Sequence, residues 1–83
     1  MSDIAQRFQT ASEKAKGLPS QSNDTLLKLY GLYKQSTSGD VSGKRPSSFN
    51  LKGRAKYDAW ASLKGTSSED AMEQYIQLVD DLA

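Results

Sequence analysis

The chain has 83 residues, a formal net charge of +1, and neither cysteine nor histidine. A chain of this length supports one small domain, so we expect a single domain over residues 1–83. Without cysteine there is no disulfide framework or thiolate metal site, and without histidine the commonest general base and metal ligand are missing. These absences predict a protein that is not an enzyme and that uses no metal or cofactor.

Charged residues are distributed unevenly along the chain. Residues 1–7 lack the apolar core of a signal peptide, and no run approaches the about 20 apolar residues that cross a bilayer, so we expect a cytoplasmic protein. Between Lys44 and Lys64 there are six basic residues and one acidic residue, whereas residues 65–83 hold five acidic residues and no basic one. A basic patch on a nearly neutral chain indicates a specific anionic ligand more than general nucleic-acid binding. Lys44 and Arg45 themselves are interpreted as solvated charges.

The first half of the chain predicts two helices followed by a long loop. Apolar residues recur every three or four positions over about residues 3–16, and Gly17 ends that segment. A second helix begins after the capping cluster Ser22-Asn23-Asp24 and continues to about Ser36. Residues 38–50 contain two glycines, a proline and several serines. So long a loop in so small a domain is often functional.

The second half of the chain predicts two further helices. One covers about residues 51–64, with Asn50 as its cap. The last helix starts at a capping box, formed either by Thr66 with Glu69 or by Ser67 with Asp70. It carries one apolar stripe from Ala71 to Leu82. No segment shows the alternation of a strand, so the chain is expected to be all-α.

Two lysines fall on apolar faces of their predicted helices. On a helical wheel, Lys34 falls between Leu27 and Tyr30, and Lys56 falls beside Trp60. A buried ammonium group is costly unless it is paired, and neither helix has a carboxylate on that face. Two interpretations remain: the lysines extend their amines into water along apolar surface, or an anion from outside the chain pairs with them.

The second helix carries more apolar surface than one packing partner can cover. Leu26, Leu27, Leu29, Tyr30 and Tyr33 span an arc of roughly 160°. Either this helix is central in the fold, or its surplus surface contacts a ligand. A ligand that suits all these features carries phosphate for the lysines, a flat ring for the tyrosines and an apolar tail for the leucines.

Several segments resemble the acyl-CoA-binding protein family. The string YGLYKQ covers residues 30–35, and the string KYDAWASLKGTSSEDA covers residues 56–71. Their order and spacing are highly specific, and the resemblance extends over nearly the whole chain. It implies an all-α four-helix bundle in up-down-down-up order, with a long connection between helices two and three.

The same resemblance implies non-enzymatic binding of medium- to long-chain fatty acyl-CoA esters, one ligand per protein. The implied role is that of an intracellular carrier that maintains a pool of acyl-CoA, shields the thioester and delivers it to lipid-metabolising enzymes. The implied protein is a monomer that contacts membranes only transiently and binds no nucleic acid. The residues themselves leave another class open, a small helical peptide- or nucleic-acid-binding module that uses the Lys44–Lys64 basic patch.

The resemblance also implies roles in binding the nucleotide. Tyr30 and Lys34 match the positions that contact the adenine and the ribose 3′-phosphate, and Lys56 matches the lysine that binds the same phosphate. Tyr33 matches an aromatic residue beside the nucleotide. Tyr75 matches the tyrosine of the last helix that lies near the adenine and the acyl chain.

The remaining implied contacts come from the first and second helices. Lys16 matches a lysine near the phosphates, and Leu26 and Leu27 match positions that face the acyl chain. The sequence departs from the family in having a shorter connection after Lys16 and in having Tyr57 where tryptophan is frequent. The first departure bears on the position of Lys16, and in the second another aromatic ring takes the place of tryptophan.

Overall fold

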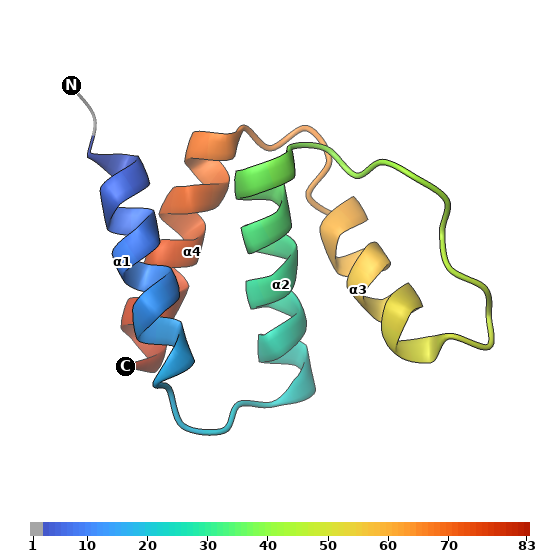
Figure 1. The fold of residues 1–83 in the computed structure, drawn as a ribbon, viewed down its shortest axis with the longest axis horizontal. Helices are drawn as coiled ribbons and strands as arrows, with labels where there is room; N and C mark the ends of the chain where they lie inside the picture. Colours follow the sequence, from blue (N-terminus) through green and yellow to red (C-terminus); the bar gives the residue numbers. More distant parts are fainter. Residues whose placement is uncertain (1–2) are drawn as a thin grey trace.

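The computed structural model describes residues 3–83, so the first two residues of the predicted domain lie outside it. The described residues form four helices and no strand, which confirms the all-α prediction (Figure 1). The helices are α1 (Ile4–Lys16), α2 (Asn23–Ser38), α3 (Leu51–Ala61) and α4 (Ser68–Leu82).

The order of the helices is the expected up-down-down-up arrangement. α1 and α4 run in one direction, and α2 and α3 run in roughly the opposite one (Figure 1). Because α2 and α3 point the same way, the chain has to travel back from the end of α2 to the start of α3. Residues 39–50 make this return, which explains why the connection is long.

Side-chain caps begin three of the helices, as their sequences predict. The side chains of Ser22, Asn50 and Ser67 each accept a hydrogen bond from the backbone N–H three residues further on. At α4 the cap is therefore Ser67, and the alternative start at Thr66 is not used. Each of these caps satisfies one of the N–H groups that a helix start leaves without an intrahelical partner.

Two helix ends differ from the prediction. α2 continues to Ser38, two residues beyond the expected end. The expected end of α3 at Lys64 is wrong, because the helix stops at Ala61. The N–H groups of Leu63 and Lys64 donate three residues back, to the carbonyls of Trp60 and Ala61, which tightens the chain into a turn.

The apolar core lies between α1, α2 and α4. Its buried members are Ile4, Phe8, Ala11, Leu32, Tyr75, Ile76 and Val79. α2 packs against both α4 and α3, whereas α1 packs against α4. The second helix is therefore central, as one of the two interpretations of its broad apolar arc required. Part of that arc stays uncovered, because Leu26 is 50% exposed and Tyr33 is 43% exposed.

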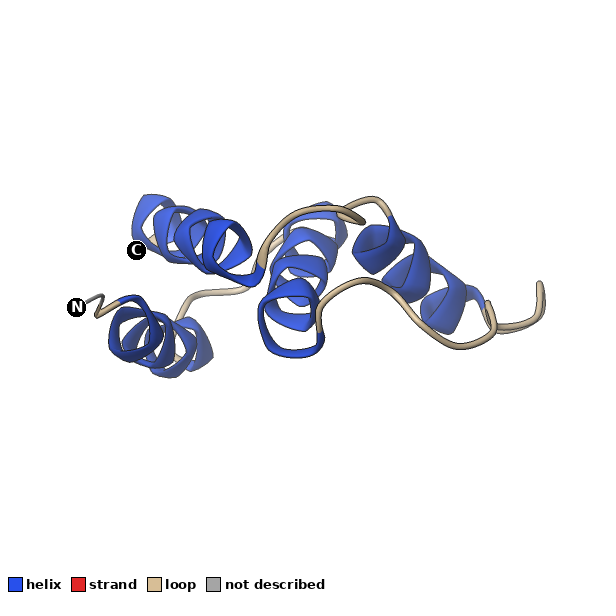
Figure 2. Ribbon diagram, turned by 90° about the horizontal axis from the view of Figure 1, so that it is seen from above, coloured by secondary structure: helices blue, strands red, loops and turns tan. Residues whose placement is uncertain are grey.

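α3 lies on the far side of α2 from the α1–α4 pair (Figure 2). The resulting molecule is a flat slab, with extents of 41 × 30 × 15 Å. α2 and α3 approach closely at Gly31, where a Cβ atom would lie only 2.7 Å from the Ala59 carbonyl oxygen. A glycine at this position allows the two backbones to meet.

Polar contacts connect α3 to the end of α2. The Trp60 indole N–H donates to the Gly39 carbonyl at 2.8 Å. The Asp40 carboxylate accepts hydrogen bonds from the Gln35 side chain at 2.9 Å and from the Gly65 N–H at 2.8 Å. These two bonds hold the pKa of Asp40 below its usual value of 3.8, the bond from Gly65 having the larger effect. The C-terminal end of α3 is thereby fixed relative to the C-terminal end of α2.

Candidate ligand-binding site

Five of the predicted site residues come from one side of α2. Successive members of the set Leu26, Leu27, Tyr30, Tyr33 and Lys34 lie one, three, three and one positions apart along the helix. At 3.6 residues per turn, this spacing brings them to one surface, which we call the α2 face. It remains partly uncovered because α1, α3 and α4 border it without covering it.

The α2 face meets α3 through two reciprocal contacts between a lysine and a ring. The amine of Lys34 on α2 lies 4.8 Å from the ring centre of Trp60 on α3. The amine of Lys56 on α3 lies 5.4 Å from the ring centre of Tyr30 on α2. Each lysine therefore contacts an aromatic residue of the neighbouring helix, in the geometry of a cation–π interaction.

The two lysines differ from each other in burial, and only Lys56 departs from the sequence-based expectation. Lys34 is half-buried, but Lys56 is exposed, so the interpretation of both as embedded cations is wrong for Lys56. The ion pairs of residues 3–83 are made by other cations, and none involves Lys34 or Lys56. Both amines are therefore free of a carboxylate partner in the described part of the chain and can contact an anionic ligand.

A cavity of about 630 Å³ lies beside α1 and is called the α1 cavity. Its lining includes Phe8, Lys16, Tyr33 and Tyr75. The rings of Phe8, Tyr33 and Tyr75 form a triangle, with centroid distances of 5.0 to 6.1 Å. Burial, with a smaller effect of Tyr33, raises the pKa of the Tyr75 hydroxyl above its usual value. That hydroxyl is therefore protonated at neutral pH and can donate a hydrogen bond.

Lys16 lies at the outer rim of this cavity. Its amine is 3.6 Å from the Glu13 carboxylate, and its side chain is largely exposed. An exposed pair of this kind contributes little to stability, so the amine can turn from Glu13 to an anionic ligand at small cost.

A second cavity, of about 390 Å³, lies between the start of α2 and α3 and is called the α3 cavity. It is lined by Asn23, Leu26, Leu27, Leu51, Lys52, Ala55 and Lys56. Tyr30 and Lys34 line neither cavity, but both belong to the α2 face, which has the α1 cavity at one side and the α3 cavity at the other. The structure therefore distributes the predicted residues along one continuous surface.

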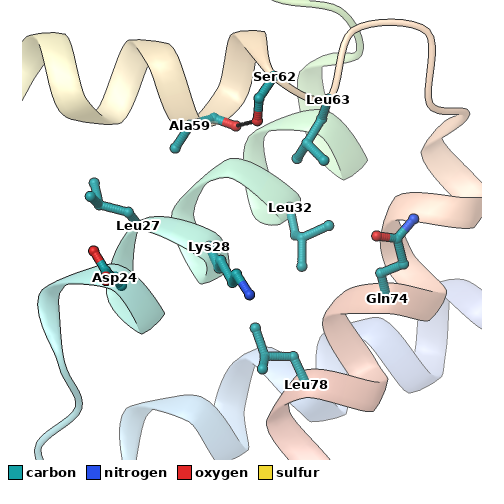
Figure 3. A pocket seen from close by; sticks show the side chains of 9 residues that line it. All are labelled: Asp24, Leu27, Lys28, Leu32, Ala59, Ser62, Leu63, Gln74 and Leu78. Atoms are coloured by element: carbon teal, nitrogen blue, oxygen red, sulfur yellow. Dashed lines mark hydrogen bonds between the residues drawn. The ribbon is translucent and has the colours of Figure 1, made fainter.

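A third cavity, of about 630 Å³, lies between α2, α3 and α4 (Figure 3). It adjoins the surface of α2 that carries Lys28 and Leu32, which lies opposite the α2 face. Leu27, Leu32, Leu63 and Leu78 surround it, and the amine of Lys28 points toward Leu78 (Figure 3). Of the predicted site residues, only Leu27 also lines this cavity. This cavity was not predicted from the sequence. The available signal was Leu32, which lies outside the apolar arc of α2.

The basic stretch between residues 44 and 64 is only partly available to a ligand. The Arg45 guanidinium makes two hydrogen bonds to the Asp58 carboxylate, at 2.9 and 2.7 Å. Arg45 is therefore exposed, as interpreted, but its charge is paired with Asp58 and is not free. The hydrogen bonds from Arg45 lower the pKa of Asp58 below its usual value. This pair fixes the long connection against the middle of α3.

The arrangement suits a ligand that combines phosphate with rings and an apolar chain. Two free amines lie beside aromatic rings, and leucines line the adjoining α3 cavity. Within residues 3–83, no group of acidic side chains is placed to hold a metal ion. The same residues include no helix that is both long and apolar enough to pass through a bilayer. The fold and the surface thus define a small all-helical module with a binding face for an anionic, partly apolar ligand.

Comparison with known proteins identifies the family. A family model described as acyl CoA binding protein matches residues 5–79. The acyl-CoA-binding protein of Saccharomyces cerevisiae is 48% identical over 80 residues, which cover 95% of this chain and 92% of that protein. The Dictyostelium discoideum acyl-CoA-binding protein is 48% identical over 77 residues, covering 92% of each chain. The chain belongs to the acyl-CoA-binding protein family.

Solved structures agree with the fold. The crystal structure of Oryza sativa acyl-CoA-binding protein 2 superposes with a TM-score of 0.93 at 50% identity, covering 95% of this chain and 87% of that chain. The solution structure of the yeast protein superposes with a TM-score of 0.75 at 48% identity, covering 94% and 92% of the two chains. These values confirm the four-helix fold implied by the sequence resemblance.

Proposed function

We propose that the protein binds medium- to long-chain fatty acyl-CoA esters, one per molecule, without covalent chemistry. The observation that carries this proposal is the pair of lysine–ring contacts between α2 and α3, in which neither amine is paired with a carboxylate of residues 3–83. Relatives named acyl-CoA-binding proteins, which are about half identical over nearly the full chain, support the choice of ligand.

In the proposed complex, Lys34 and Lys56 bind the ribose 3′-phosphate. Each amine can leave its ring and donate charge-assisted hydrogen bonds to phosphate oxygens, which are stronger than neutral hydrogen bonds. The rings of Tyr30 and Tyr33 then offer faces to the adenine. Lys16 approaches the other phosphates across the α1 cavity, and the Tyr75 hydroxyl lies where it can contact the nucleotide.

The acyl chain occupies the apolar end of the surface. Leu26 and Leu27 line the α3 cavity together with Leu51. Each methylene that leaves water contributes about 0.8 kcal/mol, so affinity rises with chain length until the cavity is filled. The same burial keeps water away from the thioester.

At the level of the cell, we propose a monomeric cytoplasmic carrier formed by one domain over residues 1–83. It holds a pool of acyl-CoA and delivers the ester to lipid-metabolising enzymes. Transient contact with membranes accompanies loading or unloading. These parts of the proposal rest on the family to which the chain belongs.

Isothermal titration calorimetry with three ligands tests the binding proposal. Palmitoyl-CoA should bind one to one, palmitate should bind poorly because it lacks the nucleotide, and palmitoyl-dephospho-CoA should bind more weakly than palmitoyl-CoA. The phosphate roles of Lys34 and Lys56 are wrong if the ester with the 3′-phosphate and the ester without it bind equally. No binding of palmitoyl-CoA at all overturns the function.

A further inference from the structure

Two large apolar side chains are presented to water at the start of α3. Phe49 is 96% exposed and Leu51 is 76% exposed. Together with Lys52 they form a surface that we call the α3 tip. Single exposed apolar residues are common on protein surfaces, but two such residues within three positions form a patch, which indicates contact with another surface. In Figure 1 this end of α3, coloured yellow, lies at the edge of the molecule away from α1 and α4.

The α3 tip is held in a defined conformation. The Asn50 side chain accepts a hydrogen bond from the Gly53 N–H at 3.0 Å, and the Asn50 N–H donates to the Ser47 carbonyl at 3.0 Å. The pair of Arg45 with Asp58 fixes the connection that leads to the tip. Phe49 and Leu51 are therefore presented on a turn whose backbone groups are bonded, and neither side chain has turned into the core.

The surroundings of the tip are cationic. Between Val41 and Tyr57 the sequence contains five basic residues and no acidic one. Only Arg45 among these basic residues makes an ion pair in the described part of the chain. The acidic residues of α4 pair instead with α1, at the other side of the slab, through Arg7–Glu73 and Lys14–Asp80. The tip thus combines exposed apolar groups with unneutralised positive charge.

We propose that the α3 tip docks on the surface of an anionic phospholipid membrane. Aromatic and aliphatic side chains enter the boundary between headgroups and acyl chains, while surrounding lysines and arginines attract the anionic headgroups. The charge of the tip is complementary to such a surface. A protein partner fits less well, because a specific protein interface needs an area of about 800 Å² on each side, far more than two side chains supply.

Docking at the tip has a consequence that rests on the proposed function. Leu51 and Lys52 also line the α3 cavity, beside Leu26 and Lys56. A docked tip therefore brings the mouth of the cavity proposed for the acyl chain to the lipid surface. The chain can then move between bilayer and cavity without crossing open water.

Vesicle sedimentation of the ligand-free protein tests the docking. The protein should sediment with vesicles of phosphatidylcholine and phosphatidylserine, should do so less as salt is added, and should remain in solution with phosphatidylcholine alone. Phe49→Ser should lower the partition coefficient about tenfold, because it removes one apolar side chain from the interface. Phe49→Trp should retain binding, and its fluorescence should shift to shorter wavelength when vesicles are added.

Several results overturn the proposal. These are equal sedimentation of Phe49→Ser and the wild type, equal binding to vesicles with and without phosphatidylserine, or unchanged emission of Phe49→Trp. Ultracentrifugation without lipid supplies one more: a dimer that Phe49→Ser abolishes shows that a second copy covers the tip. Calorimetry with palmitoyl-CoA in the absence of vesicles should give wild-type affinity for Phe49→Ser, since Phe49 lines none of the cavities described above. Because the vesicle experiment uses no acyl-CoA, failure of the ligand proposal and failure of the docking proposal are separable.

Discussion

On one side of α2, α1 and α4 bury an apolar core, whereas on the other side α3 buries Trp60 and no other residue. α3 is attached instead by close backbone approach at Gly31, by the two lysine–ring contacts, and by hydrogen bonds at Trp60 and Asp40. Apolar burial supplies most of the stability of a small domain. Cation–π contacts are weak at exposed sites, so a ligand can replace them. The side with less burial is therefore the side that can adjust to a ligand.

The largest expected effect is the loss of a core side chain on the α1–α4 side. Ile76 is buried in the core, so Ile76→Ala should lower the free energy of unfolding by about 2 to 5 kcal/mol. Urea denaturation followed by circular dichroism measures it. Leu51→Ala on α3 is the matched truncation of an exposed side chain and should change the stability by about 0.5 kcal/mol or less. Similar losses of stability in Ile76→Ala and Leu51→Ala would contradict the conclusion that the α1–α4 side supplies most of the apolar burial.

On the α3 side, the expected effect falls on affinity and not on stability. Lys56→Ala should weaken binding of palmitoyl-CoA by roughly 10- to 100-fold, as expected for a lost hydrogen bond to a charged group. The unfolding midpoint should change little, because Lys56 is exposed. The control is Lys28→Ala, which removes the same charge from the opposite side of α2. An equal loss of affinity in both variants means that only general positive charge matters.

Gly31→Ala tests whether the α3 side of α2 can be destabilised without affecting the α1–α4 side. The added Cβ would lie 2.7 Å from the Ala59 carbonyl oxygen, so α3 has to move away from α2. Gly31→Ala should therefore lower the free energy of unfolding by about 1 to 3 kcal/mol, although alanine is a better helix former than glycine. Hydrogen exchange should show faster exchange in α3 and unchanged protection in α1 and α4. The control is Thr37→Ala, on the exposed surface of α2, which should leave protection unchanged in all helices. A uniform loss of protection in Gly31→Ala contradicts the idea that the two sides of α2 respond independently.

The smallest effect concerns pH and the carboxylate that fixes the end of α2. Because hydrogen bonds lower the pKa of Asp40 in the folded state, the unfolded chain binds a proton there more tightly. The stabilisation is present above the usual value of 3.8 and is lost as the pH falls through the lower folded value. Below about pH 4, the free energy of unfolding should therefore fall more steeply for the wild type than for Asp40→Asn.

Urea denaturation at a series of pH values measures these slopes. Thr37→Ala, which changes the exposed surface of α2 without removing a titratable group, should keep the slope of the wild type. Equal slopes for the wild type and Asp40→Asn mean that the bonds from Gly65 and Gln35 do not favour the charged carboxylate.

Local sequence rules predicted the helices well. The cap at Asn50 was predicted, and Ser22 and Ser67 were among the candidates, because a capping side chain and its N–H partner are only three residues apart. The sequence did not decide between Ser22, Asn23 and Asp24, or between Thr66 and Ser67. The end of α3 was missed by three residues, because Ser62, Leu63 and Lys64 fit a helix as well as they fit the turn that they form. Terminal turns of helices are commonly ambiguous in this way.

The candidate site was predictable in composition but not in its contacts. Spacing along α2 placed Tyr30 and Lys34 on one face, because helical periodicity alone determines this. The ring that each lysine contacts belongs to the other helix, and this depends on how α2 and α3 cross at Gly31. The pair of Arg45 with Asp58 joins a loop to a helix 13 residues further on, which no local pattern indicates.

The parallel packing of α1 on α4 has a consequence during synthesis. These helices are separated by roughly fifty residues, and a ribosome adds about 5 to 20 residues per second. Several seconds therefore pass between the synthesis of α1, whose apolar stripe includes Ile4 and Phe8, and the synthesis of α4, against which it packs. During this interval the nascent chain exposes α1, and chaperones that bind apolar helices are expected to meet it first.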